Sequence, residues 1–120
     1  MNELCRAAFE GDLEDVARIL SVSTKNINTL SASGSGYSWS PLQFSAEQGK
    51  ISIVKYIVNH GANVAVVDSD GWGILKVAAN NIRGVVQYLL TVPHATDDLD
   101  HKEVIKKIFS DDPFDNWDRI

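Results

Sequence analysis

Cysteine is almost absent from this 120-residue chain, in which Cys5 stands alone. A single cysteine cannot form an intrachain disulfide, which suits a reducing compartment and predicts a cytoplasmic protein, with the nucleus as the other option. No apolar stretch approaches the roughly 20 residues that span a bilayer, and no apolar signal region stands at the start of the sequence. Only three prolines and eight glycines occur, which excludes a collagenous chain.

Basic residues are also scarce, with 11 lysines and arginines against 16 acids and a net charge of −5. The imbalance is concentrated at one end: residues 97–120 hold 8 acids and 4 bases, a net charge of −4. Nucleic acids and anionic membranes require a basic surface, so neither is expected as a partner. A protein partner remains open.

What the sequence does contain is internal repetition. Residues 4–20, 41–58 and 74–90 each read as a short helix with small residues in its middle, a turn, and a second helix that ends in paired apolar residues. Successive pairs, 19–20, 57–58 and 89–90, lie 38 and then 32 residues apart. One domain of stacked helix pairs accounts for this pattern and for the length of the chain.

The helix boundaries have recognisable signals. Ser40 precedes Pro41, with Gln43 three residues after the serine, which predicts an N-cap, a proline in the first helical position and a capping box. Gly11 and Gly49 are placed where the chain leaves the first helix of a pair through a left-handed residue, and Asn81 is expected to do the same in the third unit. In the second unit, the expected buried stripe consists of Ile53, Val54, Ile57 and Val58.

Residues 60–72 lie between the second and third units and predict a projecting finger. Gly61 is expected to end a helix, and Asp70-Gly71 is a dipeptide typical of hairpin turns.

The second unit closely resembles an ankyrin repeat. Residues 40–43 (SPLQ) stand where that family has Thr-Pro-Leu-His, and Gly49, Ile53-Val54 and residues 61–64 (GANV) match its other signature positions. The resemblance covers residues 2–92. The third unit departs from it, with Gly73-Ile74 at the helix start and Lys76 in place of the histidine. The likeness implies an all-α ankyrin-repeat solenoid of three helix-turn-helix repeats with β-turn fingers.

The expected domain covers residues 1–110, with repeats at about 2–34, 35–67 and 68–95. Residues 96–109 predict a C-terminal capping helix, because acids fill its first turn and Lys106-Lys107 its last. Residues 111–120 form an acidic-aromatic tail, in which Asp112-Pro113-Phe114 is similar to a short motif of endocytic adaptor ligands.

Catalytic and cofactor signals are weak. Gly34-Ser35-Gly36 lacks the lysine of a phosphate loop, and Asp68 and Asp70 form only part of a calcium loop, so a linker and a finger turn are the expected readings. Cys5 is expected to be a packed or partly exposed thiol. Residues 94–101 hold two histidines and three aspartates but match no ligand framework, so we expect no metal site, no cofactor and no enzyme.

The resemblance implies that a protein partner binds the concave face formed by the finger tips and the inner helices. The expected partner-binding residues are Arg6, Phe9 and Glu10 in the first repeat, Tyr37, Trp39, Glu47 and Gln48 in the second, and Ser69, Asp70, Trp72, Asn80 and Asn81 in the third. Trp39 and Trp72 occupy equivalent positions and are expected to lie side by side; packing within their own fingers is the other reading. Aromatic and arginine side chains are common energetic anchors of interfaces.

The expected function is therefore a non-catalytic protein–protein interaction module, regulatory or inhibitory, that is monomeric when free and binds no small-molecule substrate. One alternative is a fixed subunit or assembly factor of a larger complex. A second alternative is a metal-binding protein or enzyme that uses residues 94–101.

Overall fold

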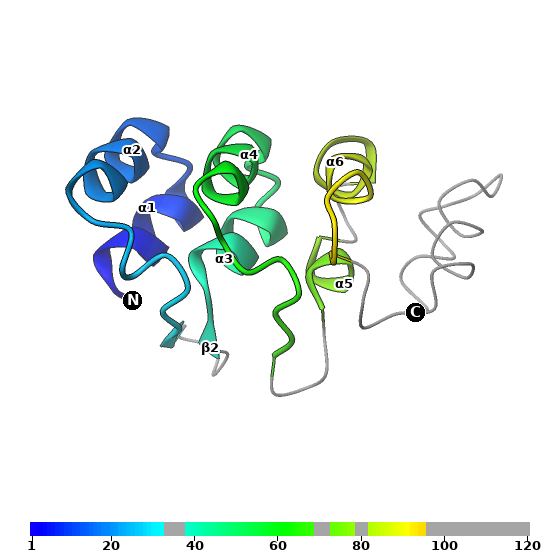
Figure 1. The fold of residues 1–120 in the computed structure, drawn as a ribbon, viewed down its shortest axis with the longest axis horizontal. Coiled ribbons are helices and arrows are strands. Elements are labelled where there is room, and N and C mark those ends of the chain that lie inside the picture. Colours follow the sequence, from blue (N-terminus) through cyan, green and yellow to red (C-terminus); the bar gives the residue numbers. More distant parts are fainter. Residues whose placement is uncertain (33–37, 69–72, 79–81, 96–120) are drawn as a thin grey trace, which may run out of the picture.

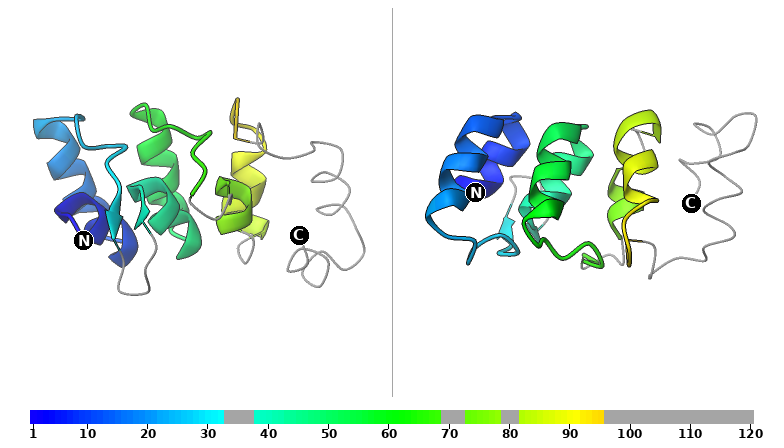
Figure 2. Two further views of the ribbon diagram at one scale, coloured as in Figure 1. Left: turned by 90° about the horizontal axis from the view of Figure 1, so that it is seen from below. Right: turned by 45° about the horizontal axis from the view of Figure 1, so that its top comes forward.

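Three pairs of helices lie side by side in a row in the computed structural model, which describes residues 1–32, 38–68, 73–78 and 82–95 (Figure 1). The same row is seen from two further directions in Figure 2. The pairs are α1 (Glu3–Glu10) with α2 (Leu13–Val22), α3 (Pro41–Glu47) with α4 (Ile51–Asn59), and α5 (Ile74–Val77) with a π-helix (Ile82–Val86) that continues into α6 (Gln87–Leu89). The predicted helix-turn-helix solenoid is confirmed. The predicted capping helix and tail lie outside the described residues.

Helices α1, α2 and α3 each start at a short polar side chain, as the sequence predicts for α3. The Ser40 backbone N–H donates to Oε1 of Gln43 at 2.8 Å, and the Gln43 N–H donates to Oγ of Ser40 at 3.4 Å, with Pro41 in the first helical position. The side chains of Asn2 and Asp12 cap α1 and α2 by accepting from the backbone N–H groups of Cys5 and Asp15. These side chains satisfy backbone donors that have no partner inside the helix.

The turns from inner to outer helix use left-handed glycines. Gly11 and Gly49 have φ angles of 81° and 70°, and Gly61, after α4, has a φ of 94°. A side chain on these residues would crowd the backbone, so glycine is the residue that permits the turn. The predicted roles of all three are confirmed, whereas Asn81 lies outside the described residues.

The fingers are short antiparallel elements beside the inner helices. Strand β1 (Ser31–Ala32) pairs with β2 (Ser38–Trp39), with Ser31 opposite Trp39 and Ala32 opposite Ser38. In the next finger, Val67 and Gly73 form an isolated antiparallel bridge. The β-turn fingers are thus confirmed, although the predicted turn at residues 70–71 is outside the described residues.

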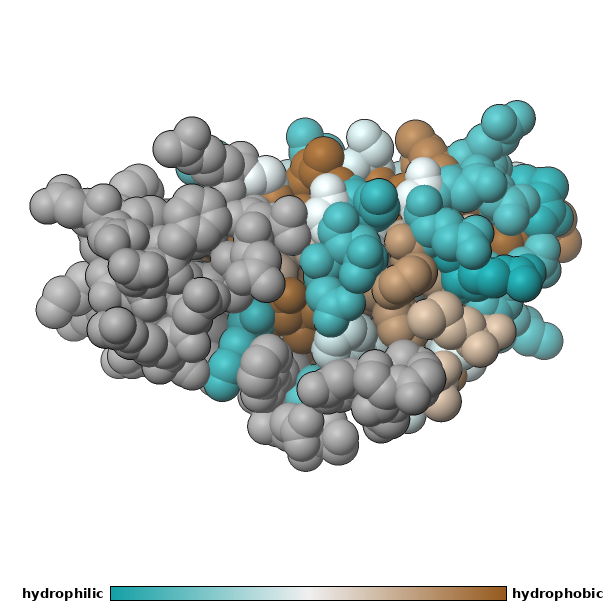
Figure 3. All heavy atoms as spheres, turned by 180° about the vertical axis from the view of Figure 1, so that it is seen from behind, coloured by the Kyte–Doolittle hydropathy of each residue, from teal (hydrophilic) through white to brown (hydrophobic). Residues whose placement is uncertain are grey.

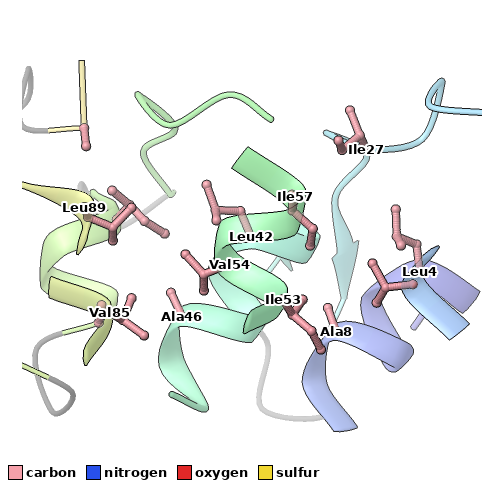
Figure 4. Close-up of a cluster of buried hydrophobic side chains, with 14 of the residues drawn as sticks. Leu4, Ala8, Ile27, Leu42, Ala46, Ile53, Val54, Ile57, Val85 and Leu89 are labelled. Carbon is pink, nitrogen blue, oxygen red and sulfur yellow. The ribbon is translucent and has the colours of Figure 1, made fainter. Parts of the chain in front are cut away.

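The third outer helix differs from a plain α-helix, because its first five residues form a π-helix. Val85, Val86 and Leu89 are nevertheless fully buried, and the π-helix contacts α4. Figure 4 shows Val85 and Leu89 on the side of the third pair that faces the second. The apolar residues of this unit therefore keep their packing position despite the irregular backbone.

The main hydrophobic core runs through all three pairs. Small residues, among them Ala8, Ala46 and Ala78, are fully buried and allow neighbouring helices to approach closely. Ile53, Val54 and Ile57 of α4 are buried as predicted, and Val58 is half-buried (Figure 4). Each pair packs on the next pair in the row, so the inner helices α1, α3 and α5 form a continuous layer. The fingers lie beside this layer.

Candidate protein-binding surface

A second, smaller hydrophobic cluster is separate from the main core. Each inner helix supplies one member, and the fourth comes from the finger strand β2: Cys5, Phe44, Val77 and Trp39. All four side chains are buried, with exposed fractions of 7% or less. The cluster joins the three inner helices to the first finger. It lies beneath the face that the sequence predicts to be concave.

Trp39 lies inside this cluster and is only 4% exposed, so of the two readings of this indole the packed one is observed and the surface-exposed one is not. Its ring centroid lies 5.5 Å from that of Phe44 in an edge-on arrangement, and its Nε1–H donates to Oδ2 of Asp68 at 3.0 Å. Alternation along β2 is the physical reason, because Ser38 faces solvent and the next residue faces inward. Trp39 therefore links two fingers and anchors them to α3.

Phe9, by contrast, covers the same cluster from outside. Its ring centroid lies 6.2 Å from that of Phe44, with the ring planes at 81°, and 37% of its surface remains exposed. Edge-to-face aromatic pairs of this geometry stabilise each other beyond their buried area. The predicted exposure of Phe9 is confirmed, and the buried ring beneath it fixes its position.

The other described candidates are polar and exposed. Arg6 and Glu10 of α1 are exposed, as are Glu47 at the end of α3 and Gln48, its C-cap residue. The Gln48 side-chain amide donates to Oε1 of Glu47 at 2.9 Å. Seen from behind Figure 1, the surface mixes hydrophobic and hydrophilic side chains (Figure 3). Among the predicted residues, Tyr37, Ser69, Asp70, Trp72, Asn80 and Asn81 lie outside the described part of the chain.

Two polar residues of this region were not predicted as site residues. Asp68 was considered only as part of an incomplete calcium loop, yet it accepts the Trp39 indole hydrogen bond from 29 residues away. Gln43 is fully buried, and within the described residues its side-chain Nε2 has no hydrogen-bond partner. The capping-box spacing predicts the role of the Gln43 side-chain oxygen at the helix start. No local sequence signal indicates that the side-chain nitrogen is buried.

Cys5 is a packed thiol, as predicted. It is fully buried, and its Sγ lies 3.8 Å from the backbone oxygens of Thr29 and Trp39. Burial raises the pKa of Cys5 to about 11, so the thiol stays protonated at neutral pH. A protonated, inaccessible sulfur is a poor nucleophile and a poor metal ligand.

The histidines were the other candidates for chemistry. The Nδ1 atom of His60 lies 2.7 Å from the Tyr56 carbonyl oxygen, and the two rings are stacked, which gives His60 a structural role at the end of α4. Across the described residues, no group of three or more potential ligands is placed to hold a metal ion, and no helix is long and apolar enough to cross a membrane. Most of the predicted alternative site at residues 94–101 lies outside that part.

Comparison with known proteins fits this architecture. Residues 4–106 match the family of ankyrin repeats, in three copies. The chain therefore belongs to the ankyrin-repeat family, as the sequence resemblance indicates. Repeats of this family generally mediate protein–protein interaction and are typically non-catalytic.

One curated relative is XBAT34 of Arabidopsis thaliana, described as a candidate E3 ubiquitin-protein ligase. It is 32% identical over 91 residues, which cover 72% of this chain and 24% of the relative, so the chain spans about a quarter of that protein. Among solved structures, a chain in the complex of the predatory endopeptidase Bd0816 from Bdellovibrio bacteriovorus with immunity protein Bd3460 is 24% identical, with a TM-score of 0.64. The alignment covers 78% of this chain and 47% of that one, and it shows a shared fold.

Proposed function

We propose that this chain is a non-catalytic binding module that regulates or inhibits a protein partner through its inner-helix and finger face. Among the described residues, the contact surface consists of Arg6, Phe9, Glu10, Glu47 and Gln48. The predicted residues of the finger tips and the third repeat, Tyr37, Ser69, Asp70, Trp72, Asn80 and Asn81, remain part of the proposed surface. Trp39 is not included, because its burial leaves almost no surface for a partner.

The observation that carries the proposal is the exposed ring of Phe9 resting on the buried ring of Phe44. A side chain that is already held in place loses little conformational entropy when a partner covers it. Aromatic rings in such positions are among the residues that contribute most to binding at interfaces. The family's general role in protein–protein interaction, and a solved neighbour whose complex contains two different proteins, support a protein as the partner.

Site-specific photo-crosslinking tests this proposal. A photoreactive amino acid at Phe9 or Gln48 probes the proposed face, and one at Ser21 or Lys55, exposed on the outer helices, is the matched control. In extract from the native cell, we expect one common partner to be crosslinked from both inner-face positions and not from the controls. Crosslinks to a common partner from the outer helices alone would contradict the proposed face.

A further inference from the structure

The third helix pair has shorter helices than the first two. Helix α5 has four residues and α6 has three, whereas the helices of the first two pairs have between seven and ten. Directly before α6, residues Ile82–Val86 form a π-helix, a conformation that is rare in proteins. Short helices are not stable by themselves in water and depend on packing against neighbouring elements. Contact with the second pair therefore supplies a larger share of the stability of the third pair.

The side-chain cap that starts the other inner helices is absent from α5. Helices α1 and α3 begin at Asn2 and Ser40, whose side chains accept from backbone N–H groups. Helix α5 begins at Gly73, which has no side chain to accept such a bond. A second glycine, Gly84, is exposed inside the π-helix, where it loses more conformational entropy on folding than another residue would. Both glycines weaken the local structure of the third pair.

The chain leaves the third pair through a strained residue. His94 has a φ of 70°, and among the described residues it is the one non-glycine with a positive φ. The chain leaves α4 instead through Gly61, with a φ of 94°. A residue with a Cβ is destabilised in this left-handed region, and glycine is not. Opening of the third pair would release this strain.

Tertiary packing of the third pair is nevertheless complete. Val85, Val86 and Leu89 are fully buried, α5 packs on α3, and the π-helix packs on α4. Figure 4 shows Val85 and Leu89 directed at the second pair. A unit that is well packed but locally weak opens as a whole, because its short helices do not persist once the contact is lost.

We propose that the third pair, described over residues 73–78 and 82–95, opens and closes as a separate unit, and that the partner binds the closed state alone. The inference rests on the proposed function, which places Trp72, Asn80 and Asn81 in the contact surface. An open third pair no longer presents its part of that surface beside Phe9. The fraction of closed molecules therefore scales the apparent affinity, and the bound partner in turn holds the pair closed.

Native-state hydrogen exchange of the full chain, without a partner, tests the opening. We expect the amides of the π-helix and α6 to be protected at least about tenfold less than those of α3 and α4. Gly84→Ala adds a Cβ that meets no atom within 4 Å and should slow exchange in the third pair by about fivefold.

Ser40→Ala is the matched control in the second pair. It weakens the capping box of α3, which is present in both the closed and the open state. Exchange in α3 and α4 should therefore become faster, while exchange in the third pair stays unchanged. Equal protection of all three pairs, or an equal response of the third pair to Ser40→Ala, would overturn the inference, because the chain would then open as one unit.

Photo-crosslinking from position 9 tests the link between opening and binding. Leu89→Ala removes a side chain that is fully buried and cannot touch a partner, and it should shift the third pair towards the open state by about 30-fold or more. The crosslink to the common partner should then weaken by about tenfold.

The two experiments separate the inference from the proposed function. An undiminished crosslink from a Leu89→Ala chain whose third pair exchanges as open would refute the control of binding and leave the proposed face standing. A wild-type chain that gives no crosslink from position 9 or 48 would contradict the proposed function. Hydrogen exchange would still decide whether the third pair opens by itself.

Discussion

Replacing Trp39 by alanine should destabilise the fold strongly rather than remove a binding contact. The indole is 4% exposed, so nearly all of its surface is removed from water. Burial of about 200 Å2 at about 25 cal/mol per Å2 corresponds to about 5 kcal/mol as an upper limit. Large aromatic side chains replaced by alanine in cores typically cost about 3–5 kcal/mol. We therefore expect Trp39→Ala to lower the free energy of unfolding by about 3–4 kcal/mol.

Urea denaturation followed by far-UV circular dichroism measures this change, because the helices report global unfolding while tryptophan fluorescence would be altered by the substitution itself. Domains of this size are commonly stable by only about 5–15 kcal/mol. The variant should therefore be only marginally folded, with a much lower urea midpoint. A Trp39→Ala chain within about 1 kcal/mol of the wild type would show that the indole contributes little to the core, and the burial argument would fail.

Two further variants test the hydrogen bond of Trp39 and the ring contact of Phe9 separately. Trp39→Phe retains an aromatic ring next to Phe44 and removes the hydrogen bond to Asp68, so it should cost about 1–2 kcal/mol. Asp68 is half-buried and can be hydrated after the change, which keeps that cost low. Phe9→Ala should cost about 1 kcal/mol, since Phe9 remains 37% exposed and loses mainly its contact with Phe44.

Three other predictions concern the first repeat, the capping box and the C-terminal end. Burial raises the pKa of Cys5 to about 11, so the folded chain keeps a proton that the unfolded chain releases from about pH 9. The free energy of unfolding of the wild type should therefore fall relative to Cys5→Ala between pH 9 and 11, and parallel pH profiles would contradict the burial of the thiol. Ser40→Ala removes the acceptor for the Gln43 backbone N–H and should cost about 0.5–1 kcal/mol, measured by urea titration; an unchanged midpoint would mean that the 3.4 Å hydrogen bond contributes nothing. Truncation after residue 95 removes the capping helix predicted at 96–109 and should produce aggregation in size-exclusion chromatography, whereas a monomer with an unchanged melting temperature would refute that assignment.

Local sequence signals were sufficient to predict much of the fold. The capping box of Ser40 and Gln43 and the left-handed turns at Gly11 and Gly49 depend on residues within a few positions of one another, so sequence spacing identifies them. The third outer helix was predicted less well. Its π-helical start at Ile82–Val86 departs from the regular helix that the apolar spacing indicates.

The candidate site was predicted only in part, and Phe9 and Trp39 show why. The sequence predicted that both aromatic residues belong to the partner-binding face formed by the fingers and the inner helices. Only Phe9 is exposed. Trp39 faces inward because of the strand pairing of β2, the ring of Phe44 and a carboxylate 29 residues away at Asp68. These contacts join separate elements, and no spacing along the chain encodes them.

The sequence by itself determined the repeating helix pairs, their caps and turns, and the family to which the chain belongs, because these features depend on short-range geometry that recurs in each unit. Tertiary structure alone decided which aromatic side chain is buried and which is left at the surface. That choice depends on how the first finger packs across three inner helices. The exposed ring of Phe9, held by a buried cluster beneath it, is a product of that packing.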